Sequence, residues 1–156
     1  MRRRGLAFAT AVLVAACGST NPSGGVTYAT YSYNCCAEIS ADPITWHSGQ
    51  HLTLHWTAIA GQPTPDRTAH AMKLHIRLTG PFATVDALKQ ANGQGRTPAG
   101  VRSIDAMTRS VTDRTGGTPA SELDLPADLP AGYYNLDTSV SSDCCSTGGA
   151  TVVTIH

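Results

Sequence analysis

The sequence predicts an all-β domain, an antiparallel β-sandwich with at most one short helix. Three segments of the 156-residue chain alternate apolar and polar side chains with a period of two, the pattern of strands that bury one face. Turn signals rich in glycine and proline separate these segments. Short strands divided by such turns favour two packed antiparallel sheets.

Five segments are predicted to form strands, and in chain order they are residues 26–33, 51–56, 72–78, 133–140 and 150–155. In the second of them, Leu52 and Leu54 share one face while Thr53 and His55 share the other. The same alternation identifies the third and fourth segments. The first and last are predicted from their content of Thr, Tyr and Val, which favour strands.

The segments between the strands divide into turns, one helix and one irregular stretch. A helix of about two turns is predicted only for residues 84–91. Residues 92–100 are predicted to form a loop, and residues 101–111 an irregular strand. The turn signals are Ser48-Gly49, residues 61–65, Gly80-Pro81, Gly116-Gly117 and residues 130–132.

The start of the chain has the composition of an export signal. Three arginines at positions 2–4 precede apolar or small residues at positions 6–16, and Cys17 follows directly. About 11 apolar residues are too few to span a bilayer, whereas a charged start and a short apolar run are typical of a signal peptide. The ending Val-Ala-Ala-Cys resembles the lipobox of bacterial lipoproteins. This resemblance implies that Cys17 becomes the lipid-carrying first residue of the mature protein.

The chain is therefore expected to have three parts: a lipoprotein signal peptide (residues 1–16), a lipidated flexible tether (residues 17–25) and one domain (residues 26–156). The multiple acyl chains of a bacterial lipoprotein, palmitate among them, would hold the protein firmly, whereas one chain binds only marginally. The expected location is the extracytoplasmic face of the cell membrane, which is the periplasmic side if the host has two membranes.

The charge balance argues against nucleic acid as a partner. The chain has 11 Lys and Arg and 11 Asp and Glu, and removal of the three arginines at positions 2–4 leaves eight basic against eleven acidic side chains. The mature net charge is therefore about −3, whereas binding to phosphate groups needs clustered Lys and Arg.

Two stretches resemble immunoglobulin-like domains. Residues 46–50, followed by the strand at 51–56, resemble the turn from strand A into strand B of bacterial immunoglobulin-like domains. Residues 129–134 resemble the tyrosine corner that leads into strand F, with Tyr134 in the corner position. The resemblance implies an immunoglobulin-like β-sandwich, in which the start of strand A and the F–G loop lie at the same end.

The four remaining cysteines form two doublets, Cys35-Cys36 and Cys144-Cys145. An even number of cysteines in an exported domain favours structural disulfides. The immunoglobulin-like topology implies that the doublets face each other, which favours two bridges between them, a disulfide staple whose order stays open. The alternative is a four-thiolate site for zinc or Cu(I), or a redox couple.

Two other sets of side chains are candidates for binding. His55 and His75 could chelate a metal ion across neighbouring strands, although solvent-facing strand positions explain both histidines equally. Tyr28, Tyr31 and Tyr33 are a candidate binding surface beside the first cysteine doublet, because aromatic side chains are enriched at interface hot spots. The alternative is that these tyrosines pack on the first strand.

No catalytic motif is present: the sequence lacks the Gly-x-Ser-x-Gly, His-Glu-x-x-His and Ser-x-x-Lys patterns. We therefore expect no cofactor and no catalysis. The sequence predicts a lipid-anchored binding or cell-envelope-associated module, attached to the membrane through Cys17, whose protein or envelope partner is unknown. The alternative is an extracytoplasmic lipoprotein that handles copper or zinc.

Overall fold

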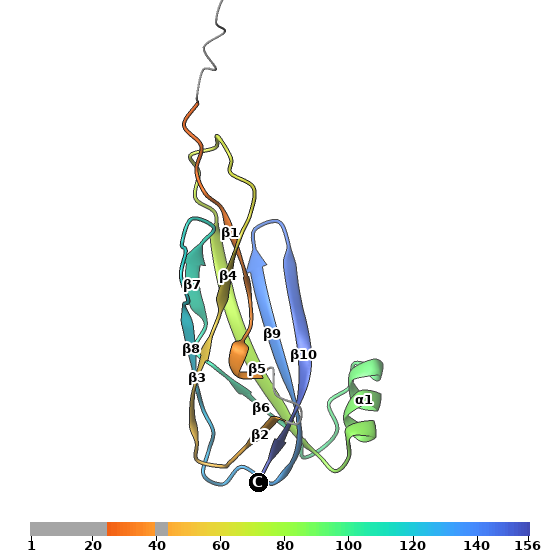
Figure 1. Ribbon diagram of the computed structural model, residues 1–156. Helices are drawn as coiled ribbons and strands as arrows, with labels where there is room; N and C mark the ends of the chain where they lie inside the picture. Colours follow the sequence, from red (N-terminus) through yellow and green to blue (C-terminus); the bar gives the residue numbers. More distant parts are fainter. Residues whose placement is uncertain (1–24, 40–43) are drawn as a thin grey trace, which may run out of the picture.

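The computed structural model describes residues 25–39 and 44–156, which are mostly β-strand (Figure 1). The predicted signal peptide, most of the tether and Cys17 lie outside the described residues. In chain order the elements are β1 (Tyr31–Asn34), the 3-10 helix η1 (Ala37–Ile39), β2 (Ile44–Trp46), β3 (His51–His55), β4 (Thr57–Ala60), β5 (Ala71–Phe82), α1 (Val85–Gln94), β6 (Arg102–Asp105), β7 (Arg109–Thr112), β8 (Ala120–Asp124), β9 (Gly132–Ser142) and β10 (Ser146–Ile155). The predicted all-β class with one short α-helix is confirmed for this part of the chain.

A six-stranded sheet forms one layer of the molecule. Its strand order is β2-β10-β9-β5-β6, and β7 also pairs with β5. All of these pairings are antiparallel except β10 with β2, which is parallel. Strand β5 is the centre of this sheet because β9 pairs along one of its edges and β6 and β7 pair along the other.

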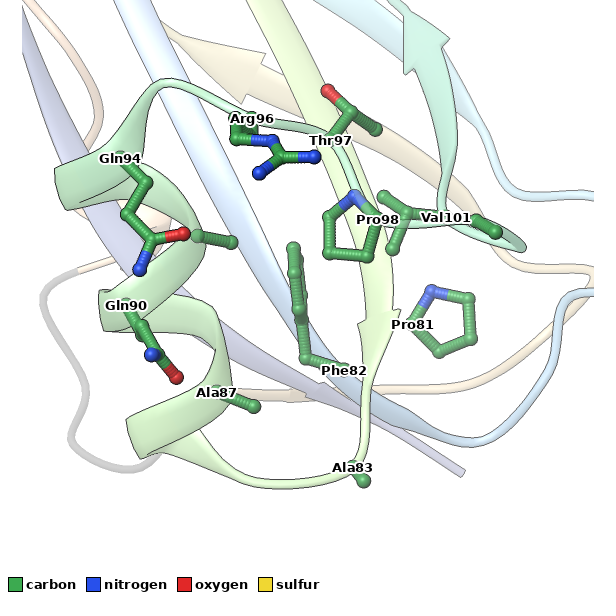
Figure 2. A pocket seen from close by; sticks show the side chains of 12 residues that line it. Pro81, Phe82, Ala83, Ala87, Gln90, Gln94, Arg96, Thr97, Pro98 and Val101 are labelled. Atoms are coloured by element: carbon green, nitrogen blue, oxygen red, sulfur yellow. The ribbon is translucent and has the colours of Figure 1, made fainter.

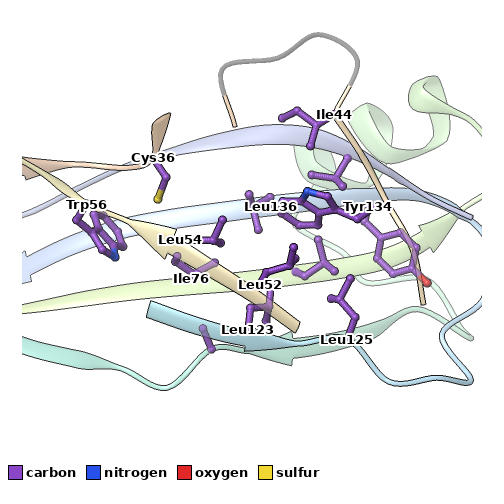
Figure 3. Packing of buried hydrophobic residues seen from close by; sticks show 14 of the residues in the cluster. Cys36, Ile44, Leu52, Leu54, Trp56, Ile76, Leu123, Leu125, Tyr134 and Leu136 are labelled. Carbon is purple, nitrogen blue, oxygen red and sulfur yellow. The ribbon is translucent and has the colours of Figure 1, made fainter. Parts of the chain in front are cut away.

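The opposite layer consists of two short sheets, β3 with β8 and β1 with β4. The apolar faces of the two layers enclose the core (Figure 3). Leu54 on β3 and Leu123 on β8 meet Ile76 on β5 and Leu136 on β9, and all four are at most 1% exposed. Burying each such side chain contributes about 1.5–3 kcal/mol. The predicted strands at 51–56, 72–78 and 133–140 are confirmed as β3, β5 and β9.

The helix is longer at its C-terminal end than the sequence pattern indicated. Thr84 is its N-cap, and the Thr84 hydroxyl accepts a hydrogen bond from the backbone N–H of Ala87 at 3.1 Å. Gly95 ends the helix in the left-handed conformation, with φ of 60°, which glycine adopts without a steric penalty. None of the described helices is long and apolar enough to cross a membrane.

Tyr134 links the start of β9 to the turn before it. Its ring is fully buried, and its hydroxyl donates a hydrogen bond to the Pro130 carbonyl at 2.7 Å. This is the contact that a tyrosine corner makes. Gly80 on β5 lies against the face of the ring, where no larger side chain fits.

Candidate functional site

A groove lies between α1 and residues 96–101, at one end of the six-stranded sheet (Figure 2). Leu88 and Ala91 of the helix pack on Phe82, the last residue of β5, and together they form a small second core. Tyr133 and Val152 add to it from the outer face of the sheet. The helix is therefore held firmly over one end of this face, and the groove opens beside it.

The groove has a volume of about 530 Å³, within the usual range for small-molecule sites. Phe82, Pro98 and Val101 give it an apolar floor. Its polar side chains are those of Gln90, Gln94, Arg96 and Thr97, and the Arg96 guanidinium makes no ion pair with any described residue. Amide groups and a guanidinium beside an apolar floor suit a ligand that joins an apolar part to an anionic group.

The N-terminal end of the described chain lies at the opposite end of the molecule (Figure 1). The length of β5 gives the scale of this separation, because its 12 residues extend about 36 Å from Ala71 to Phe82. Ala71 pairs with Thr112, and the backbone N–H of Tyr31 donates to the carbonyl of Asp113 at 2.7 Å. The N-terminal segment therefore joins the domain at one end of β5, while Phe82 of the groove lies at the other.

Arg114 fastens the N-terminal segment to the domain. Its side chain is 17% exposed, and its guanidinium lies 5.5 Å from the centre of the Tyr28 ring. Its two terminal nitrogens donate to four backbone carbonyls. These are Tyr28 at 3.3 Å, Ala29 at 2.9 Å, Asp66 at 2.7 Å and Thr68 at 3.2 Å.

The three tyrosines do not form a common exposed surface, so that prediction is wrong for Tyr33. Tyr33 is 5% exposed, and its hydroxyl donates a hydrogen bond to the Thr115 carbonyl, with the Thr112 carbonyl as a second, longer contact at 3.2 Å. Burial raises the pKa of this hydroxyl. Tyr28 and Tyr31 are half-buried. The physical reason is that Tyr33 occupies the inward-facing position of β1, where its ring joins the hydrophobic core.

The structure does not contain the predicted bridges between the two cysteine doublets. Cys35 is bonded to Cys36, whereas Cys144 and Cys145 are exposed free thiols. The predicted staple needs all four sulfur atoms, and the bond within the first doublet leaves no thiol there to pair with the second.

His55 and His75 lie on opposite faces of the molecule, so a metal site shared between them is also wrong. His55 is on the exposed face of β3, where its Nδ1 is 2.6 Å from Glu38 Oε1. His75 is on the outer face of β5, where its Nε2 is 3.1 Å from Asp105 Oδ1. The core separates the two strands, and each side chain points away from it. Within residues 25–39 and 44–156, no three His, Cys, Asp or Glu side chains converge on a metal position.

His51 lies between two carboxylates on the exposed face of β3 and β8. Its Nδ1 is 2.6 Å from Asp124 Oδ1, and its Nε2 is 2.9 Å from Glu122 Oε2. The hydrogen bond to Asp124, assisted by the charges of Asp124 and Glu122, raises the pKa of His51 above its ordinary 6.5. The Thr53 hydroxyl donates to the same Glu122 oxygen at 2.7 Å and orients that carboxylate.

We expect the raised pKa of His51 to make stability depend on pH. A histidine whose pKa is higher in the folded state stabilises the fold fully below the unfolded pKa, and the contribution is lost as the pH rises through the folded value. Chemical denaturation from about pH 5 to about pH 9 should therefore show wild type losing stability above about pH 6.5, relative to a His51→Gln variant. A constant difference between the two proteins over this range would contradict the prediction.

Comparisons with known proteins give no family for this chain. No family model matches the sequence, and no curated protein matches it. One of the solved structures that resemble it is the sporulation control protein Spo0M from Bacillus subtilis, with 13% sequence identity and a TM-score of 0.35. The alignment covers 84% of this chain and 50% of that one, so the chain spans about half the length of the neighbour it matches.

Proposed function

We propose that this protein is a lipid-anchored, extracytoplasmic immunoglobulin-like module that binds a ligand without catalysis. The observation that carries the proposal is the placement of two features at opposite ends of β5. The N-terminal segment that follows Cys17 joins the domain at one end, and the groove beside α1 lies about 36 Å away at the other. A domain attached in this way would present its groove away from the membrane.

The strand order supports an immunoglobulin-like fold. Strands β3 and β8 correspond to strands B and E of that fold, and β5, β9 and β10 correspond to strands C, F and G. Strands β6 and β7 continue the sheet beyond β5, as the additional strands of variable-type domains do. The hydrogen bond from Tyr134 to Pro130 lies at the corner before β9, where the fold places its conserved tyrosine.

The lipid attachment is supported by the sequence before and at Cys17, where the basic residues 2–4, the apolar residues 6–16 and the ending Val-Ala-Ala-Cys are in the order of a lipoprotein signal. Ten residues lie between Cys17 and Tyr28, whose carbonyl accepts a hydrogen bond from Arg114. The eleven steps from Cys17 to Tyr28 span at most about 40 Å, so the domain would stay close to the membrane.

The attachment is tested by replacing Cys17. Full-length protein is expressed in bacteria grown with an alkyne-labelled fatty acid, and membrane and soluble fractions are compared. Wild type is expected to carry the label and to sediment with membranes, whereas Cys17→Ser should be unlabelled and lose membrane association. Cys145→Ser is the matched control and should behave as wild type. Unlabelled wild type, or labelled Cys17→Ser, would contradict the proposal.

The groove is tested with octanoate, a probe that has an apolar chain and a carboxylate, and with octanol, which lacks the charge. Amide chemical shifts of Phe82 and Val101 are expected to move with octanoate and to move much less with octanol. Arg96→Gln should weaken octanoate binding about tenfold, the loss of about 1.4 kcal/mol expected for a charge-assisted hydrogen bond. Arg67→Gln changes an exposed arginine outside the groove and should have no effect. Equal responses to the two probes would contradict a role for Arg96.

A further inference from the structure

Two adjacent free thiols lie at the turn that joins β9 to β10. Cys144 and Cys145 are both exposed, and their Sγ atoms are 2.8 Å apart. Neighbouring side chains on an extended strand point to opposite faces, so the turn is what brings these sulfurs together. The two sulfur atoms are therefore neighbours at an exposed turn, in reach of the same reagent.

The turn also brings a hydroxyl group close to both sulfur atoms. The Ser142 hydroxyl is 3.4 Å from Cys144 Sγ and 3.5 Å from Cys145 Sγ. The Ser142 backbone N–H donates to the Cys145 carbonyl at 2.8 Å and fixes the turn. The pKa of the Cys144 thiol is lowered, mainly by a hydrogen bond from Cys145 and next by one from Ser142. The negative charge of Asp143 opposes this shift. An accessible thiol of lowered pKa beside a second thiol is the usual arrangement of redox-sensitive cysteines.

We propose that Cys144 and Cys145 form a redox-active dithiol that closes to a disulfide by exchange with an external disulfide. The Cys144 thiolate attacks one sulfur of that disulfide, forms a mixed disulfide and releases one thiolate. The Cys145 thiol then loses its proton to solvent and attacks Cys144 Sγ, which releases the second thiol. The two cysteines lose two electrons in total, and the external disulfide is reduced to two thiols.

The first doublet, Cys35-Cys36, is bonded in this structure, whereas the second carries two free thiols. The two doublets differ in access, because Cys144 and Cys145 are exposed whereas Cys36 is 6% exposed and Cys35 is half-buried. Attack by an external thiol needs access to a sulfur atom, so exchange is expected to be faster at the β9–β10 turn than at the first doublet.

The experiment equilibrates purified full-length protein with mixtures of reduced and oxidised glutathione and quenches free thiols by alkylation. Cleavage before Asp143 releases residues 143–156, which contain Cys144 and Cys145 as their cysteines. Mass spectrometry of this peptide is expected to show reversible conversion between a dialkylated form and a form with an internal disulfide. Cys145→Ser should instead accumulate one glutathione on Cys144, because it lacks the thiol that resolves the mixed disulfide.

Two further measurements separate a working dithiol from two independent thiols. Phenylarsine oxide, which binds two thiols together and releases water, should modify reduced wild type and fail to modify either single cysteine variant stably. Ser142→Ala should slow the exchange about twofold, because a higher thiol pKa leaves less thiolate. Wild type that accumulates glutathione on Cys144 without closing the ring would overturn the proposal. Crosslinks between residues 143–156 and Cys35 or Cys36 would also overturn it.

Discussion

Replacement of Gly80 by alanine is expected to lower the free energy of unfolding by about 3 kcal/mol, the upper end of the usual cost of overpacking a core. A Cβ atom at this position would lie 2.6 Å from Cγ and 2.8 Å from Cε1 of Tyr134. The Tyr134 ring cannot move aside easily, because it is fully buried and its hydroxyl donates a hydrogen bond to the Pro130 carbonyl. The variant must therefore shift β5 or break the Tyr134 hydrogen bond.

Thermal and denaturant unfolding measure this effect, and a loss of about 3 kcal/mol corresponds to a fall in Tm of roughly 10 °C for a domain of this size. Gly93→Ala is the matched control. Gly93 lies within α1, and a Cβ atom there would meet no other atom within 4 Å. Alanine at this position should raise stability by about 0.5–1 kcal/mol, because glycine weakens a helix. Equal effects of the two substitutions would contradict the packing argument.

The strands that could be predicted from the sequence are those whose burial alternates along the chain, as in β3 and β5. Strand β8 was missed because a serine occupies one of its core positions. Ser121 is 2% exposed, and its hydroxyl accepts a hydrogen bond from the Trp56 indole at 3.0 Å. Strand β4 was missed because Ala58 is its only partly buried residue, so no apolar pattern marks it.

The candidate site depends on contacts between distant segments, which local patterns do not contain. The helix at 84–91 and the loop at 92–100 were both predicted, but neither pattern shows that α1 folds back over Phe82 and that Arg96 lies beside it. The available signal was an arginine, Arg96, in a predicted loop a few residues after Gln90 of the predicted helix, and this signal is weak. The pairing of the cysteines likewise depends on the register of β9 with β10, which places Cys144 and Cys145 at the turn.

Replacement of Arg114 by alanine is expected to destabilise the domain by about 2 kcal/mol and to loosen the N-terminal segment more than the rest. Arg114 donates to four carbonyls from two segments, residues 28–29 and 66–68. Hydrogen bonds from a charged donor contribute about 1.5–3 kcal/mol each. In the variant, water binds these surface carbonyls in place of the arginine, so the net loss of stability is much smaller than the sum of the four bonds. Tyr28 and Thr64, whose backbones exchange hydrogen bonds at 2.8 and 3.0 Å, should lose protection from hydrogen exchange.

Two control variants distinguish this role from a general effect of charge. Arg67 lies between Asp66 and Thr68, is exposed and makes no ion pair among the described residues. Arg67→Ala should therefore change the free energy of unfolding by less than about 0.5 kcal/mol. Arg114→Lys keeps the charge but lacks the planar fork that reaches several carbonyls at once, so it should lose most of the stabilisation. If Arg114→Ala matched Arg67→Ala, the N-terminal segment of the described chain would be held by its backbone pairing alone, and Arg114 would not fasten it to the domain.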